Sequence, residues 1–100
     1  ICIDTGHANM VGLNVPDMIR QVGSHLKATH INDNYGIKDE HFSPFNGTIP
    51  WKEVVQALRD IDYQECFAFE THHLTSMYPK EVQPYLVDFS YALGEYLLKL

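Results

Sequence analysis

The sequence predicts an α/β fold with parallel strands, and two observations lead to this prediction. Short apolar runs alternate with stretches of helical periodicity, and turn-forming residues follow each apolar run. An alternating order of strands and helices pairs the strands in parallel through right-handed crossovers. With 45% apolar and 12% aromatic residues, the 100-residue chain is typical of a folded domain and not of a disordered one.

Three apolar runs predict the strands. They cover residues 1–3, 26–31 and 66–70, and the polar segments that follow them are Asp4-Thr5-Gly6, Asn32-Asp33-Asn34 and Thr71-His72-His73. The chain has no initiator Met and opens on what reads as the end of a strand. We therefore expect it to be part of a longer protein.

Three helices are predicted between and after these strands. Asn14 caps the first helix and Gly23 ends it, with Pro16 in its first turn. The second begins after Thr48–Pro50 and keeps helical spacing over residues 51–61, and the third begins near Pro84 and runs to the end. Residues 32–50 form one long loop, and loops of this length in compact domains are usually functional or disordered.

The strand ends carry a set of ionisable residues, namely Asp4, His30 and Glu70. Parallel strands bring their carboxyl ends to one edge of the sheet, where α/β proteins place their sites. The residue two positions before each of these three residues in the strand is small, whereas the strand residues of the opposite parity are bulkier and more apolar. The three side chains should therefore share a face with small residues. Cys2 and Cys66 are expected to be buried.

Carboxylates mixed with imidazoles suit zinc, manganese, iron or cobalt better than calcium. His7, Asp39 and His41 extend the polar set, and simpler interpretations stay open for the strand-end residues. Asp4 could form a turn or cap a helix, His30 could be a hydrogen-bonded structural residue, and Glu70 could be an exposed strand terminus. His25, His72 and His73 have no comparable placement and are predicted to lie at the surface or behind the site.

Several motifs together resemble the xylose isomerase-like TIM-barrel superfamily, which includes sugar-phosphate isomerases, epimerases and endonuclease IV-like enzymes. The motifs are Ile3-Asp4-Thr5-Gly6-His7, His30-Ile31-Asn32-Asp33-Asn34, Asp39-Glu40-His41, Asn46-Gly47-Thr48-Ile49-Pro50-Trp51 and Phe69-Glu70. The resemblance implies that residues 1–100 are the C-terminal fragment of a single (β/α)8 TIM-barrel domain, about strands 6–8 with their helices.

The resemblance also implies roles for the site residues. Asp4, His30 and Glu70 would be three of the four ligands of a divalent metal (Mn, Zn, Co, Mg or Fe), and the fourth ligand would lie outside the chain. Glu70 would also be catalytic, because it resembles a ligand that moves a proton. His7, Asp39 and His41 would bind substrate or a second metal.

The function implied is a metal-dependent isomerase or epimerase of a small sugar or polyol, or its phosphate, acting through an enediolate. The isolated chain is expected to be inactive and to self-associate or swap elements with a neighbouring copy. Ketose 3-epimerases of this group carry an Arg where this chain has Gly36.

The alternative function is an endonuclease IV-like apurinic endonuclease with zinc. A net charge of −6 without a basic cluster disfavours nucleic acid as a partner. No apolar run is long enough for a membrane span, so a membrane association is not expected. Two cysteines fit a reducing compartment, which predicts a cytoplasmic protein.

Overall fold

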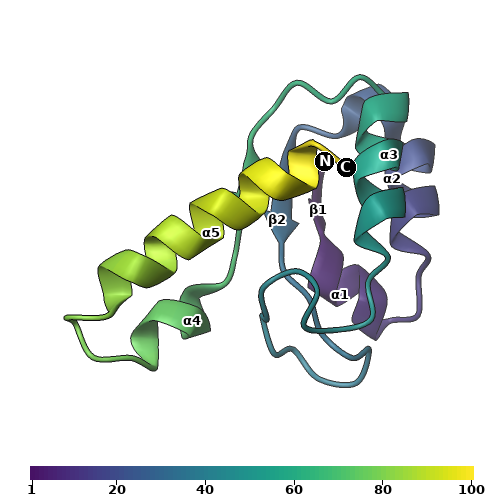
Figure 1. The fold of residues 1–100 in the computed structure, drawn as a ribbon. Coiled ribbons are helices and arrows are strands. Elements are labelled where there is room, and N and C mark those ends of the chain that lie inside the picture. Colours follow the sequence, from purple (N-terminus) through teal and green to yellow (C-terminus); the bar gives the residue numbers. More distant parts are fainter.

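The computed structural model describes residues 1–100 and contains one parallel three-stranded sheet (Figure 1). The strands β1 (Cys2–Asp4), β2 (Ala28–Ile31) and β3 (Phe67–Phe69) lie in the order β1-β2-β3. The register pairs Asp4 with His30, and His30 with Ala68. The predicted α/β class with parallel pairing is confirmed.

Five α-helices accompany the sheet, and three of them are the predicted ones. These are α2 (Val15–Val22), α3 (Trp51–Asp60) and α5 (Gln83–Leu98), and Gly23 ends α2 with a φ of 56° in the left-handed region. Two short helices were not predicted: α1 (Thr5–Met10), which follows β1 directly, and α4 (His72–Ser76), which begins shortly after β3. Helices this short show too few turns to give a periodic apolar pattern.

One face of the sheet packs into the hydrophobic core. Ile3, Thr29 and Ile31 are buried there, and apolar side chains of α2 and α3 such as Ile19 and Val54 cover them. Figure 1 shows α2 and α3 side by side, and these two helices are in contact. The bulkier strand parity therefore faces the helices, as predicted.

The opposite face of the sheet carries the small residues, and it is open. Cys2 is exposed, as is His30 on the same parity, so the prediction of a buried Cys2 is wrong. Cys66 lies just before β3 and is also exposed, which contradicts its predicted burial. Side-chain size was a good guide to which face each residue occupies, but no element of this chain covers the small-residue face.

The helix α5 packs on the rest of the molecule only along part of its length. Leu97 is fully buried, whereas Phe89 and Tyr96 are about half exposed despite their helical spacing. In Figure 1 the first half of α5 extends away from the sheet, beside α4. The sheet ends at β3, so the apolar residues of that half have no further strand to cover.

The long loop between β2 and α3 is fastened by a buried carboxylate. Asp33 is fully buried and accepts hydrogen bonds from the backbone N–H groups of Asn34, Gly47 and Ile49, at 2.9, 3.0 and 3.2 Å. The indole Nε1 of Trp51 donates to the same carboxylate at 2.8 Å, and this side chain is buried, as expected for a helix-packing residue. Asp33 therefore joins the two ends of the loop.

No helix in the structure is long and apolar enough to cross a membrane.

Candidate metal centre

The three strand-end residues converge at one edge of the sheet. Asp4 ends β1, His30 lies beside it on β2, and Glu70 follows β3. Nδ1 of His30 lies 3.1 Å from Oε2 of Glu70 and 3.8 Å from Oδ2 of Asp4. One ligand atom from each residue lies within 4.8 Å of the other two. We call this set the strand-end group.

The two carboxylate oxygens of Asp4 differ in their hydrogen bonds. Its Oδ1 accepts hydrogen bonds from the N–H of His7 at 2.9 Å and from Nδ2 of Asn32 at 3.1 Å. Its Oδ2 is buried and has no hydrogen-bond partner. Burial opposes ionisation, but these hydrogen bonds, together with the contact to Glu70 and the charge of His7, hold the pKa of Asp4 below its usual value. Nδ1 of His7 and Nδ1 of His30 lie 3.5 and 3.8 Å from Oδ2, and an ionised carboxylate oxygen that is buried and accepts no hydrogen bond fits a bound cation.

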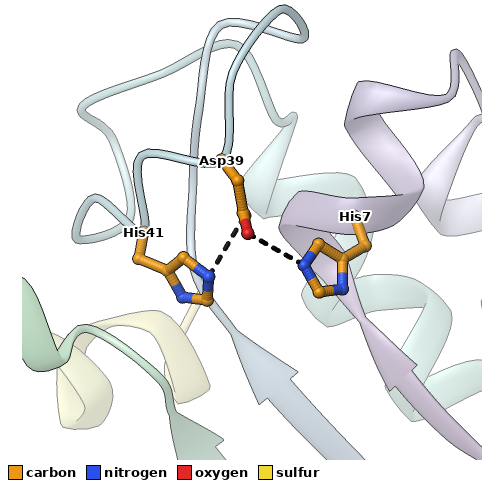
Figure 2. Close-up of side chains that lie close together, drawn as sticks. All are labelled: His7, Asp39 and His41. Atoms are coloured by element: carbon orange, nitrogen blue, oxygen red, sulfur yellow. Dashed lines mark hydrogen bonds and ion pairs between the residues drawn. The ribbon is translucent and has the colours of Figure 1, made fainter.

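A second set of side chains lies beside the first, namely His7, Asp39 and His41 (Figure 2). The Asp39 carboxylate lies between the two rings, 3.1 Å from Nε2 of His7 and 3.1 Å from Nε2 of His41. The hydrogen bond to Asp39 and the charge of Asp4 raise the pKa of His7. Burial opposes ionisation of Asp39, but its hydrogen bonds with His7 and His41 lower its pKa overall. We call this set the loop group.

The ring of His41 is held in place from both sides. Nδ1 lies 2.9 Å from the backbone oxygen of Glu70, which can only accept, so Nδ1 carries the proton. Burial opposes the charged ring, but the hydrogen bonds to Glu70 and Asp39 raise the pKa of His41 overall. With Nδ1 bonded to the backbone, Nε2 donates to Asp39 when the ring is charged, and on losing that proton it could bind a cation, an arrangement that metal-binding histidines commonly use.

The structure brings all six predicted site residues to the same edge of the sheet, in these two groups. It also adds His72, which forms a third set of nearby ligand atoms with His41 and Glu70. The ring centroids of His41 and His72 lie 4.9 Å apart. No pattern in the sequence pointed to His72, because the helix α4 that positions it was not predicted.

Two buried polar residues that support the groups were not predicted as site residues either. Asn32 orients Asp4, and Asp33 fastens the loop that carries Asp39 and His41. The sequence offers no signal that separates them from ordinary turn residues, because polar residues follow all three strands and only the structure shows that these two are buried. His25 is exposed and belongs to none of the three sets, as predicted.

The chain belongs to the xylose isomerase-like TIM barrel family, whose model matches residues 1–89. It is 37% identical over 70 residues to a D-psicose 3-epimerase of Enterocloster bolteae, and the aligned residues are 70% of this chain and 22% of that protein. It is 35% identical over 71 residues to an uncharacterized protein of Sinorhizobium fredii, covering 71% of this chain and 23% of the relative.

A third relative is an uncharacterized protein of Methanocaldococcus jannaschii, 30% identical over 76 residues, with 74% of this chain and 26% of the relative covered. The chain thus spans about a quarter of the length of the curated relatives it matches. No solved structure matches the chain significantly. The parallel sheet and its helices are consistent with a fragment of a TIM barrel.

Proposed function

We propose that the complete protein is a metal-dependent isomerase or epimerase of a small sugar or polyol. The observation that carries the proposal is the convergence of Asp4, His30 and Glu70 at the strand ends, with Oδ2 of Asp4 buried and without a hydrogen bond. These residues would hold a divalent cation, with further ligands from outside this chain. The family and its D-psicose 3-epimerase member support the reaction class.

Glu70 is the proposed catalytic residue. A divalent cation, when bound, polarises neighbouring carbonyl and hydroxyl oxygens and stabilises the charge of an enediolate. The Glu70 carboxylate would take a proton from the sugar carbon beside the carbonyl. In an isomerase it would return the proton to the neighbouring carbon, whereas in an epimerase a second acid from outside this chain would protonate the opposite face of the same carbon. The side chain is 35% exposed, so a substrate can reach it, and Nδ1 of His30 at 3.1 Å orients it.

The loop group is proposed to bind substrate hydroxyls or a second cation. Asp39 and His41 offer a carboxylate and an imidazole beside the strand-end group, and His7 is more than half exposed there. Both roles need the same side chains in the same place. Cation titration distinguishes them, because a second cation adds a second binding step.

The proposed reaction is not narrowed to that of a ketose 3-epimerase. Gly36 stands where ketose 3-epimerases of this group carry an Arg, and its φ of 76° is strained for any other residue. This position therefore carries no guanidinium, and the proposed proton exchange is not restricted to carbon 3 of the sugar.

The test is a panel of ketoses and polyols incubated with the complete protein, with manganese or with a chelator. We expect interconversion of at least one sugar pair, its loss on chelation and its loss in Glu70→Gln. Interconversion that survives chelation would contradict the metal role. Full activity in Glu70→Gln would contradict the proton-transfer role.

A second candidate is an endonuclease IV-like enzyme with zinc. The observation that favours it is the presence of adjoining ligand sets, with His41 and Glu70 each belonging to two of them. The net charge of −6 counts against a DNA-binding surface. Robust incision of abasic DNA by the complete protein would replace the isomerase proposal.

A further inference from the structure

A cavity of about 540 Å³ lies beside the candidate metal centre. Its walls come from the long loop, from α4 and the segment after it, and from α5. Asp39 and His41 belong both to this cavity and to the loop group. A substrate bound at the strand ends could therefore extend into the cavity without leaving the protein surface.

Part of the cavity lining is polar and acidic. Asp39, Glu40 and Asn46 belong to this part, and their side-chain oxygens are hydrogen-bond acceptors. Oε2 of Glu40 is buried and has no hydrogen-bond partner within the chain. Hydroxyl groups supply the donors that such acceptors need. A phosphate, in contrast, carries negative charge and would lie against two carboxylates.

Much of the remaining lining is apolar. Phe42, Leu74 and Phe89 belong to this part, together with Met77 and Tyr78. Apolar side chains of this kind pack against the C–H groups of a sugar or polyol, while the carboxylate and amide oxygens of the lining accept its hydroxyl protons. The mixed lining therefore suits an uncharged ligand with both polar and apolar groups.

The cavity also lacks lysine and arginine, whose charges bind phosphate most strongly. None of the seven lysines and arginines of the chain lines it, and its imidazoles are His41 and His73. TIM barrels that bind phosphorylated substrates frequently do so at two neighbouring strand-end loops and the start of a short extra helix. In this chain the long loop that lines the cavity beside α4 contributes Asp39 and Glu40 instead of cations.

We infer that this cavity receives the uncharged, hydroxyl-bearing end of the substrate, so that the protein acts on a free sugar or polyol and rejects its phosphate ester. The inference rests on the proposed isomerase function and narrows it. It assigns the part of the substrate beyond the reacting carbons to a site formed by Glu40, Asn46 and Phe89.

The first experiment compares free ketoses with the phosphate monoesters of the same ketoses, using the complete protein with manganese. We expect kcat/KM for the free sugar to exceed that for the ester by about 100-fold or more, as expected for like charges brought together. Equal or faster turnover of the ester would overturn the inference and leave the isomerase function standing. Turnover of neither form would instead contradict the proposed function.

Calorimetric titration with the same pairs measures binding without turnover. The free sugar is expected to bind more tightly, and an ester that binds equally well, or a sugar that does not bind, overturns the inference. Phe89→Ala should raise KM for the free sugar on the order of 10-fold with little change in kcat. Tyr85→Ala is the matched control, because Tyr85 lies on the same helix, is 72% exposed and does not line the cavity.

Glu40→Gln removes one of the two carboxylates and keeps the shape of the side chain. It should raise kcat/KM for the phosphate ester relative to the free sugar. An unchanged ratio in Glu40→Gln, or an unchanged KM in Phe89→Ala, would show that the substrate does not enter the cavity.

Discussion

Buried polar side chains determine where the candidate ligands lie. Asn32 is fully buried and donates to Oδ1 of Asp4, which leaves Oδ2 for a cation. Asp33 is also fully buried and holds both ends of the loop that carries Asp39 and His41. Without their partners, such groups would destabilise the fold, because an unpaired buried polar group costs about 1–3 kcal/mol.

Asp33 and Trp51 allow a graded test of this loop anchor in the complete protein. Asp33→Asn places an amide NH₂ against donors and should lower the free energy of unfolding by about 2–4 kcal/mol. Trp51→Phe keeps most of the packing and removes one of the four hydrogen bonds, so a loss of about 1–2 kcal/mol is expected. Denaturant unfolding measures both, and a Trp51→Phe effect larger than that of Asp33→Asn would contradict the account.

At the level of elements, strands and the longer helices could be predicted from the sequence, whereas the short helices could not. Asp4, His30 and Glu70 share one strand parity, and parallel pairing therefore brings them to one edge of the sheet. The helix α1 depends on a cap, since Asp4 accepts from the N–H of His7, and it is too short for a periodic pattern. Burial of Cys2 was mispredicted because it depends on what covers the sheet face.

Replacing glycine by alanine should have opposite effects on stability at Gly6, close to the site, and at Gly94 in α5. Gly94 lies inside α5, and a Cβ there meets Phe69 at an ordinary contact distance of 3.7 Å. Gly94→Ala should therefore raise the free energy of unfolding by about 0.5–1 kcal/mol. Gly6→Ala should destabilise, because its Cβ would overlap the side chain of Asn32. Thermal unfolding of the complete protein checks both, and a stabilising Gly6→Ala would contradict the packing described.

The contact between α2 and α3 should depend on pH. Asp60 accepts hydrogen bonds from Gln56 and from Nε of Arg20, each at 2.9 Å, and these lower its pKa. A lowered folded-state pKa stabilises the protein above the unfolded value of about 3.9, and this contribution is lost as pH falls through the folded value.

Asp60→Asn removes this dependence. The Tm difference between the wild type and Asp60→Asn should therefore be largest between about pH 5 and 7 and should shrink below about pH 4. Thermal melts of the two proteins across this range measure it. A difference that grows toward acid pH would contradict the assignment.

At the level of the whole molecule, the chain leaves much apolar surface uncovered. The strands β1 and β3 each pair only with β2, and Tyr85 and Tyr91 of α5 are 72% and 71% exposed. Exposed strand edges and apolar helix faces promote association. The 100-residue chain expressed alone should therefore self-associate or exchange elements between copies, and it should be inactive. A clean monomer by light scattering at high concentration would contradict this expectation.

The claim that the strand ends form a metal centre is tested most directly by cation titration of the complete protein. His30→Ala removes a proposed ligand, whereas His25→Ala removes an exposed histidine outside all three ligand sets. We expect His30→Ala to weaken manganese binding by at least about 100-fold, beyond the effect of losing an outer-shell partner. His25→Ala should bind manganese as the wild type does. Unchanged manganese affinity in His30→Ala would contradict the metal centre.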